Sequence, residues 1–429
     1  MSTMGHIGES PLKRSQMTFH KEDKCPVCSV KFLKDDNTLL KNIIKVPNYG
    51  LVHDSCFTPF IKEEELRILY KIRCYSIGDT ITVTPALREL RTIYPRAYIT
   101  VMTFFPELFQ YNPCVNALYD LSRPITEDEM NSHHFHVDAF NSDKGHHFAM
   151  HSVDFSAASA LDRAIFPHHW NYDLFYGTDE RTSAKKIITD AGIDIENDKL
   201  ILVHPHGTEW KTRDWGPHHM PELVRRIKEK LPEHKIVSIG GKRDVKAHEM
   251  KNYVELPEAI NLYGKLTLLQ TAAFMDMPCC KLLVTPDTGT LHLGASRQEL
   301  PIVGIFTLIR AHFRTPVRKG KYSYKFIGIE AESGCNCTYQ NRQLSNEMRF
   351  DTCPKLDFLK HTRTINIPKN FKLEGVRNFF PDTEWNADDL NKQIIDKERE
   401  FKYESLPCFP SVDKAMLAVE KAMELWGAE

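Results

Sequence analysis

The sequence predicts an α/β protein built from two Rossmann-like parallel-sheet domains that face a cleft, preceded by a small zinc-binding unit. Short apolar runs typical of buried strands alternate with helical patterns of about 10–15 residues, and this alternation is typical of parallel sheets with crossover helices. The alternation occurs in two blocks, which are separated near residues 190–198. Two such blocks predict two domains whose ligand lies beyond the carboxyl ends of the strands.

The composition is that of an ordinary soluble globular protein. A length of 429 residues favours two or three domains, and 41% apolar residues supply material for their cores. The net charge of −1 gives no global field that would draw the chain onto nucleic acid, although a local patch can still do so. The sequence shows no apolar run of membrane-spanning length and no secretory signal. Its 11 scattered cysteines do not resemble a disulfide framework, so we expect a cytoplasmic location.

The elements follow from the apolar patterns of each block. Residues 1–62 form a mobile tail and the small unit, and residues 63–190 form the first domain. In that domain we expect strands at 67–74, 97–102 and 115–121, helices at 79–95 and 106–112, and an irregular region at 125–172. In the second domain, residues 191–375, we expect strands at 199–205, 234–241, 259–264, 281–287 and 301–306, with helices at 216–230, 244–252, 266–276 and after Thr288. Residues 376–429 are predicted to form helices that pack back across both domains, ending in an amphipathic helix at 411–426.

The turn between the strand at 281–287 and the next helix contains the sequence Asp-Thr-Gly. The first turn of a helix presents backbone N–H groups and partial positive charge, which suit a phosphate group. Gly289 permits close approach, Thr288 offers a hydroxyl, and Asp287 orients the turn. His292 follows four residues after Thr288, on the same helical face. The alternative is an aspartate that caps the helix and a histidine that belongs to the core.

Two further loops of the second domain follow strands. The loop after the strand at 199–205 contains Thr208, Lys211 and Arg213, which either meet the same ligand or form a solvated surface. The loop after the strand at 234–241 contains Asp244. Its carboxylate either accepts ribose hydroxyls or simply follows a tight Gly-Gly turn.

In the first domain, Gly78 and Asp79 lie where a strand leads into a helix. A carboxylate facing the cleft can take a proton from an incoming hydroxyl, as a general base does. An aspartate that caps the helix explains the same position equally well.

Four separated segments together resemble glycosyltransferase family 9, the ADP-heptose:lipopolysaccharide heptosyltransferase-like enzymes. These segments are "SIGDTITVTPALRELRTIYP", "KTRDWGPHHMPEL", "LYGKLTLLQTAAFMD" and "PDTGTLHLGASRQELPIVGIF", and they span roughly residues 68–353. The resemblance implies a GT-B fold, a nucleotide-diphosphate sugar bound by the second domain, and inversion at the anomeric carbon without a catalytic metal.

The resemblance also implies roles for single residues. Asp79 is the general base, and Thr288, Gly289 and His292 hold the donor diphosphate, with Asp287 in the same motif. Arg213 stands where the family usually has Lys, so Lys211 and Arg213 compete for a phosphate contact, and Thr307 stands where the family has Gly. Residues 125–172 match no family pattern, which leaves the acceptor open.

A four-ligand zinc site is predicted outside the resemblance. Cys25 and Cys28 form one two-residue spacing, and His53 and Cys56 form a second. Three thiolates and one imidazole make a closed tetrahedral shell, so the zinc is structural. The alternative is a chance pairing of unliganded residues. Another three cysteines resemble a cluster in many family members, and we interpret them as buried or free thiols: Cys335, Cys337 and Cys353.

Two further groups are left without a firm role. The histidines at 133, 134, 136, 146, 147 and 151 fit no metal-ligand spacing and are interpreted as surface loops near the acceptor. The stretch at 309–326 carries Arg310, Arg314, Arg318, Lys319 and Lys321. It is either a solvated face or a patch beside a diphosphate or a polyanionic acceptor.

These features predict an inverting glycosyltransferase with a nucleotide-sugar donor and a glycan or lipopolysaccharide-like acceptor. One alternative is a phage-type DNA base glycosyltransferase that acts on modified DNA, for which the zinc unit and the basic stretch would be suited. The other is an inactive, zinc-bearing nucleic-acid-binding protein. A salt-dependent interaction with DNA favours either alternative, and turnover separates them.

Overall fold

The computed structural model places most of both predicted domains. It describes residues 43–46, 50–53, 63–74, 76–139, 150–161, 163–205, 215, 218–241, 256–307, 310–318, 321–322, 325–331 and 409–427. Statements about structure below refer to these ranges.

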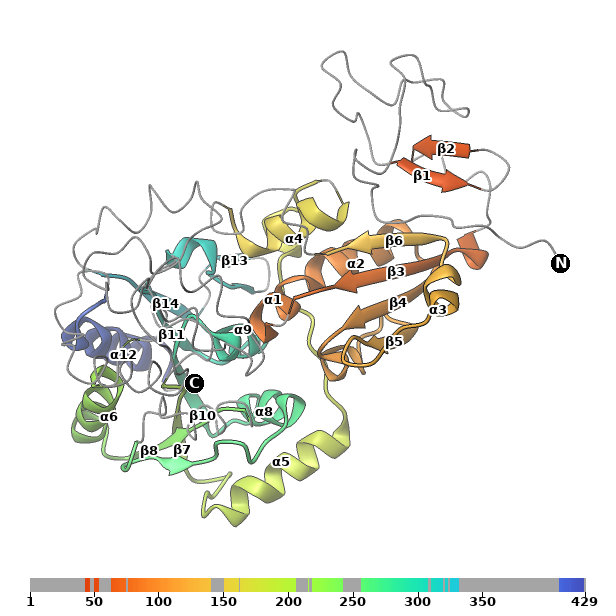
Figure 1. The fold of residues 1–429 in the computed structure, drawn as a ribbon. Helices are drawn as coiled ribbons and strands as arrows, with labels where there is room; N and C mark the ends of the chain where they lie inside the picture. The colour runs from red at the N-terminus through yellow and green to blue at the C-terminus, as the bar shows by residue number, and fades with distance from the viewer. Residues whose placement is uncertain are drawn as a thin grey trace, which may run out of the picture.

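The second domain contains a six-stranded sheet in which every pairing is parallel (Figure 1). The strand order is β9-β8-β7-β10-β11-β14, so the first strand along the chain, β7, pairs with both the second and the fourth. This is the doubly wound order of a Rossmann fold, with its switch point between β7 and β10. The strands are β7 (Lys199–Val203), β8 (His234–Ser238), β9 (Ile260–Asn261), β10 (Cys280–Pro286), β11 (Ile302–Ile305) and β14 (Phe326–Ile329).

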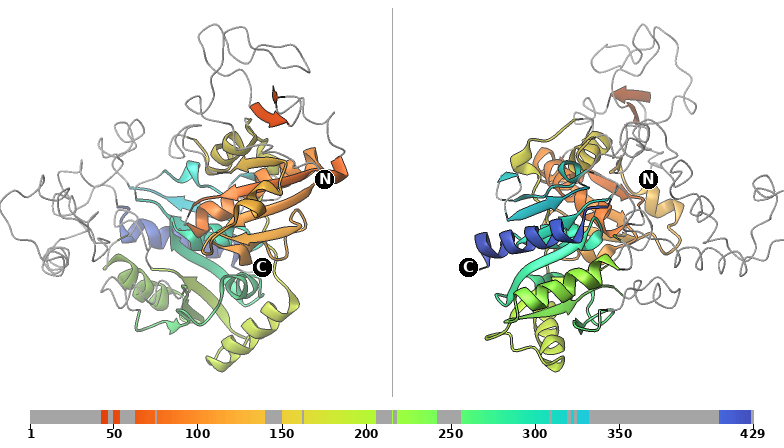
Figure 2. Two further views of the ribbon diagram at one scale, coloured as in Figure 1. Left: turned by 45° about the vertical axis from the view of Figure 1, so that its right-hand side comes forward. Right: turned by 90° about the vertical axis from the view of Figure 1, so that its left-hand side faces the viewer.

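Helices cover both faces of this sheet because alternate strand residues are apolar on both sides. Ile201 and Val284 point into a core with α6 (His219–Lys230) and α12 (Val412–Trp426), which lie side by side on one face (Figure 2). Leu202 and Leu283 point into the core on the other face. The helices on that side are α5 (Thr178–Asp190), α8 (Leu268–Met275) and α9 (Gly289–Ala295).

The first domain contains a smaller sheet with the order β5-β4-β3-β6, again entirely parallel. Its first strand along the chain, β3, also lies between the second and the fourth, which gives this sheet its own switch point between β3 and β6. The elements are β3 (Arg67–Ile72), α1 (Ile77–Thr82), α2 (Thr84–Ile93), β4 (Tyr98–Thr103), β5 (Ala117–Asp120), α3 (Glu127–Asn131), β6 (Phe135–Asp138) and α4 (Ser152–Leu161).

The single helix predicted at 79–95 is two helices that join at Val83. Pro85 lies in the first turn of α2, where its missing N–H is tolerated. The Thr84 hydroxyl donates to the Ile81 carbonyl at 2.8 Å, which satisfies one acceptor at the end of α1.

The two domains share one continuous apolar core on the α8–α9 side of the second sheet. Helix α1 packs against α9, so the first turn of a first-domain helix meets the first turn of a second-domain helix. Helix α5, which the sequence assigned to the first domain, packs against α8 of the second. Helix α12 was predicted to cross both domains, whereas its main contacts are with α6 and with the strands β10, β11 and β14.

Several short elements complete the described chain. None of its helices has the length and apolar character needed to cross a membrane. The elements are the antiparallel pair β1 (Ile43–Val46) and β2 (Gly50–His53), the 3₁₀ turns η4 (Glu63–Glu65), η5 (Pro106–Phe109), η7 (Pro167–His169) and η9 (Ala311–Phe313), and the pair β12 (Val317–Arg318) and β13 (Lys321–Tyr322).

Candidate active site

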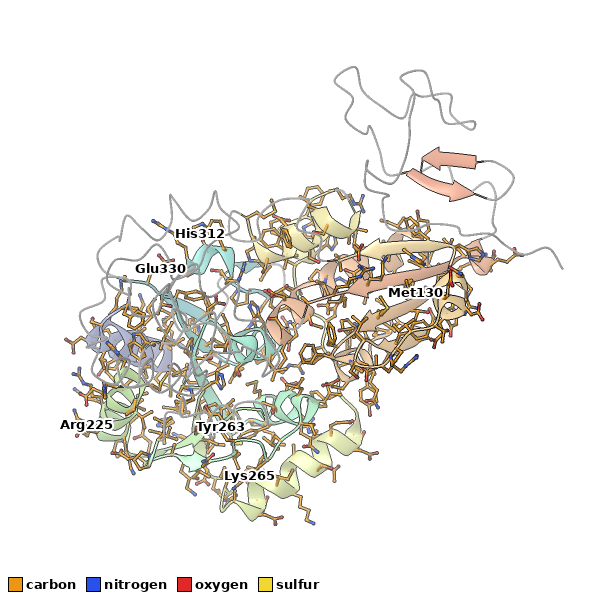
Figure 3. The ribbon with its side chains drawn as sticks, viewed as in Figure 1. Met130, Arg225, Tyr263, Lys265, His312 and Glu330 are labelled. Atoms are coloured by element: carbon orange, nitrogen blue, oxygen red, sulfur yellow. The ribbon has the colours of Figure 1, made fainter. Side chains whose placement is uncertain are left out.

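The switch point of the second sheet lies where β7 and β10 end side by side. His204 follows β7, and its backbone N–H donates to the Val284 carbonyl of β10 at 3.1 Å. Its Nδ1 lies 2.9 Å from the Ile239 carbonyl, directly after β8. Tyr263, which follows β9 and is labelled in Figure 3, stacks on the His204 ring with a centroid distance of 6.2 Å. Polar and aromatic groups from successive strands therefore gather at this edge, where doubly wound sheets bind ligands.

The turn from β10 into α9 stands at the same edge. Thr288 is the N-cap residue of α9, but its side chain makes no capping hydrogen bond. The Thr288 hydroxyl lies 3.3 Å from the Thr285 hydroxyl instead. The Asp287 carboxylate and His292 Nε2 are 3.8 Å apart, and both side chains are about 5% exposed. A carboxylate and an imidazole are thus held together at the start of this helix.

The corresponding turn of the first domain contains Gly78 and Asp79. Asp79 is not the helix cap, because Ser76 occupies that position and its side chain accepts from the Asp79 N–H at 3.4 Å. Asp79 is half-buried in the first turn of α1. Burial, with the nearby charge of Asp79, raises the pKa of the Cys74 thiol to about 12. Cys74 therefore stays protonated beside Asp79 and does not compete with it as a base.

The two turns, far apart in the sequence, meet at the domain junction. A side-chain carbon added at Gly78 would lie 2.6 Å from Cδ2 of His292 and 3.5 Å from Cα of Gly289. One added at Gly289 would lie 3.0 Å from Cβ of Ile77. Both positions need glycine because any side chain would force α1 and α9 apart. The structure thus brings Gly78, the neighbour of Asp79 in the chain, against the His292 ring.

A buried polar cluster, which the sequence patterns did not predict, lies beside this contact. His151 stacks on Trp170 with a centroid distance of 4.2 Å and lies 3.0 Å, through Nε2, from the Thr315 carbonyl. The Tyr172 ring lies 5.8 Å from the His292 ring. Burial, together with the charge of Arg314, lowers the pKa of His151 to about 3, so this imidazole is neutral at physiological pH.

Two of the three basic residues of the predicted patch whose burial the structure describes are buried. Arg314 is 2% exposed and Arg318 is 0% exposed, whereas Arg310 is exposed. The Arg318 guanidinium donates to the carbonyls of Gly294, Ala295 and Leu300, at 3.0, 3.2 and 2.6 Å. It therefore anchors the C-terminal end of α9, where a cation also complements the helix dipole. The spacing of basic residues in the sequence could not show whether Arg318 anchors a helix or lies on a solvated surface.

The described histidines of the region 133–151 are structural rather than parts of surface loops. His133 and His136 are buried and bond the Thr100 hydroxyl and the Met130 carbonyl, at 2.8 and 3.1 Å. His134 Nδ1 accepts from the Arg67 N–H at 3.0 Å. Met130, labelled in Figure 3, lies on α3 and far from α9. Within the described ranges no group of three or more His, Cys, Asp or Glu side chains could hold a metal ion.

Several predicted site residues lie outside the described residues. His53 ends β2, but its side chain is not described. The others are Thr208, Lys211, Arg213, Asp244, the predicted zinc ligands Cys25, Cys28 and Cys56, and the cysteines Cys335, Cys337 and Cys353.

Two Rossmann-like α/β domains that meet through the glycine-containing first turns of two helices define a GT-B-type protein. Residues 162–361 match the family model of glycosyltransferase family 9 (heptosyltransferase). The resemblance to this family is therefore confirmed for residues 162–361, and this match supports a glycosyltransferase. No curated relative matches the chain.

Three solved structures have a partial similarity to the chain. A family 9 glycosyltransferase from Veillonella parvula is 18% identical with a TM-score of 0.47, over 63% of this chain and 87% of that one. The ADP-heptose LPS heptosyltransferase II of E. coli is 17% identical with a TM-score of 0.46, over 63% and 92%. The dodecameric iron-containing heptosyltransferase TibC, in complex with ADP-D-beta-D-heptose, is 12% identical with a TM-score of 0.48, over 85% of each chain.

Proposed function

We propose that the chain transfers a sugar from a nucleoside-diphosphate sugar to an acceptor hydroxyl, with inversion at the anomeric carbon and without a catalytic metal. The observation that carries the proposal is the contact of the Gly78–Asp79 turn with His292 and Gly289. This contact supports the proposal because it brings the turn that contains Asp79 next to a helix start of the second domain. The family 9 match supports the choice of donor.

In the proposed reaction, the acceptor oxygen bonds to the anomeric carbon while Asp79 takes the proton of the acceptor hydroxyl. The bond between the anomeric carbon and the donor's phosphate oxygen breaks, and its electron pair leaves with the nucleoside diphosphate. Thr288, Gly289 and His292 meet the charge that develops there, and Asp287 orients His292 from 3.8 Å. Attack from the face opposite the leaving group gives the inverted product.

The remaining donor contacts are proposed for loops that follow β7 and β8. Thr208, Lys211 and Arg213 come after β7, which adjoins β10 at the switch point. Either Lys211 or Arg213 contacts the phosphates, and Asp244, after β8, accepts ribose hydroxyls. In this proposal the nucleoside lies over the strand ends and the sugar lies toward the first domain.

The acceptor is proposed to be a glycan or a lipopolysaccharide-like molecule, with modified DNA as the alternative. Burial of Arg314 and Arg318 removes two of the five cations that would have favoured a DNA-binding face. The structure therefore weakens the argument for a phage-type DNA glycosyltransferase and for an inactive nucleic-acid-binding protein.

A thermal-shift screen with UDP-, ADP-, GDP- and CMP-linked sugars tests the proposal. A ligand present at a hundred times its dissociation constant stabilises the fold by about 2.7 kcal/mol, so a true donor raises Tm measurably. Hydrolysis or transfer of the stabilising sugar in the presence of candidate acceptors then tests activity. A chain that none of the nucleotide sugars stabilises would contradict the proposal.

We also propose a structural zinc at Cys25, Cys28, His53 and Cys56, on the strength of their paired spacing. Metal analysis of protein purified without chelators is expected to find one zinc per chain, and Cys28→Ser is expected to lose it. Because structural zinc contributes to folding, Cys28→Ser should unfold the N-terminal unit and spare donor binding. Wild-type protein without stoichiometric zinc would refute the site.

A further inference from the structure

The short turn η7 and the residue before it expose three aromatic rings, which we call the aromatic turn: Phe166, His168 and His169. Phe166 is 71% exposed, the largest exposure among the large apolar side chains that the structure describes, and both histidines are exposed as well. The Phe166 and His168 rings stack with centroids 5.7 Å apart and planes 10° apart, and the His169 ring lies 3.9 Å from the His168 ring. Single exposed apolar residues need no explanation, whereas a group of exposed rings held together calls for a partner.

The aromatic turn is held in place from beneath. The residues that flank it, Ile165 and Trp170, are buried, and Trp170 Nε1 donates to the Ile165 carbonyl at 2.8 Å. Arg88 of α2 donates to the carbonyl of His169 and, at 3.0 Å, to that of Asn171. A surface whose rings are already positioned loses little conformational entropy when a ligand binds, so it favours recognition.

The aromatic turn lies at the border of the two domains. On one side Arg88 joins it to α2, which directly follows α1 and its Asp79. On the other side η7 packs against β12 and β13, and Arg318 of β12 joins these strands to α9. Trp170, the C-cap residue of η7, stacks on His151 of the buried cluster beside the α1–α9 contact. A ligand on this turn would therefore lie next to the domain junction.

The chemistry of the aromatic turn fits a sugar. A pyranose ring has a face of C–H groups, which pack on the electron-rich face of an aromatic ring, and its hydroxyls need hydrogen-bond partners such as imidazole nitrogens. Nucleic acid instead requires cations that meet its phosphates. Arg163 is the only arginine or lysine in the sequence 163–169, and it forms an ion pair with Glu89. The charge of this segment thus favours a sugar over a nucleic acid.

We propose that the aromatic turn binds a pyranose ring of the acceptor glycan, with the C–H face of the sugar on Phe166 and its hydroxyls bonded by His168 and His169. This inference rests on the proposed function, which makes the acceptor a glycan. The turn is a binding surface outside the groups that carry out the transfer. It therefore sets the affinity for the acceptor and leaves donor binding unchanged.

Binding of wild-type protein and its variants to a printed array of pyranose oligosaccharides and lipopolysaccharide core oligosaccharides, followed by titration calorimetry with the glycans that bind, tests the inference. Phe166→Ala should weaken glycan binding about tenfold, since the ring that packs on the sugar is lost. Its Tm and its thermal shift with the donor should equal those of wild-type protein. Phe166→Tyr should retain glycan binding, whereas Phe166→Leu, which is apolar but has no flat ring, should lose it.

Phe175→Ala is the matched control, because Phe175 is also an exposed phenylalanine of the segment between the domains, at 39% exposure. It is expected to bind glycans as wild-type protein does. If Phe166→Ala lowers the Tm, His168→Ala decides: weaker glycan binding by that variant supports the inference, and unchanged binding overturns it.

Four outcomes would overturn the inference. Equal glycan affinity of wild-type protein and Phe166→Ala refutes the contact, and an equal loss in Phe175→Ala makes the effect unspecific. Wild-type protein that binds no glycan of the array has no such site, and a loss confined to binding of double-stranded DNA makes the occupant a nucleic acid. Failure of the proposed function shows separately, as the absence of any thermal shift with the nucleotide sugars.

Discussion

The two helix starts that meet at the domain junction are built differently. In α1, the Ser76 side chain accepts from the Asp79 N–H, so the helix is capped by its own sequence. In α9, Thr288 occupies the cap position without a capping side-chain bond. The first turn of α1 thus has a side-chain cap, and the first turn of α9 has none. This difference agrees with our proposal that the first domain supplies the base and the second receives the diphosphate.

The two turns are also held in place by different means. Helix α1 is fixed locally, since the Thr80 and Thr82 hydroxyls donate to the carbonyls of Ser76 and Asp79 at 2.7 and 2.9 Å. Helix α9 is fixed from a distance, by the buried Arg318 at its C-terminal end. The Arg318 anchor lies at the end of α9 opposite to the turn at which we propose that the diphosphate binds.

The largest effect is expected for Asp79→Asn. Because Ser76 is the cap, the variant should keep its fold, and because the amide cannot accept a proton, it should lose most of its turnover. General base catalysis typically contributes about 10²–10⁴ in rate, or roughly 3–5 kcal/mol of the barrier. The loss should appear in kcat rather than in the donor KM, measured by steady-state kinetics.

Asp179→Asn is a matched control for this variant, since Asp179 also lies in the first turn of a helix, α5, but is exposed. It should retain turnover. Transfer by Asp79→Asn within a few-fold of the wild-type rate would mean that the base is elsewhere.

A smaller effect is expected for His292→Ala, which tests the α9 side of the comparison. Loss of one hydrogen bond to the diphosphate should weaken donor binding by about 1–3 kcal/mol in calorimetry. The variant also removes a buried ring, so its stability should fall as well.

His136→Ala separates these two effects. His136 is a buried histidine of the first sheet that bonds the Met130 carbonyl. This variant should lose stability and keep its donor affinity. Unchanged donor affinity in His292→Ala would make His292 a core residue like His136.

The sequence was sufficient to predict the alternation of strands and helices and the two strand-to-helix turns before α1 and α9, because both features depend on local sequence patterns. It identified Asp79, Thr288, Gly289 and His292 as candidates, and the structure brings their turns together. It could not tell that Ser76, and not Asp79, caps α1, because that needed the Ser76 hydrogen bond, and the role of Asp79 as a base stays a prediction. The sequence analysis put the domain boundary near residues 190–198, after α5, whereas α5 packs on α8 of the second domain. A helical pattern does not say which sheet the helix covers.

Contacts between distant segments explain the remaining differences. Arg314 and Arg318 look like part of a solvated basic stretch, but the carbonyls that bind Arg318 come from α9 and the loop after it. Tyr172 carries no sequence signal, because its burial beside His292 results from the fold. Such residues become visible only when the burial of each side chain is known.

The smallest effect is expected from removing the two cap hydroxyls, and it tests the comparison most directly. Ser76→Ala should lower the unfolding free energy by about 0.5–1 kcal/mol, the lower part of the range for cap residues, because its bond to the Asp79 N–H is long at 3.4 Å. Thr288→Ala should change it less, since the Thr288 side chain makes no capping bond to lose. For diphosphate affinity the order should reverse: Thr288→Ala should bind the diphosphate more weakly than Ser76→Ala does. Denaturant unfolding and calorimetry on both variants measure the two orders. If Thr288→Ala is the less stable variant and binds diphosphate normally, Thr288 is a structural residue and the proposed difference between the turns is wrong.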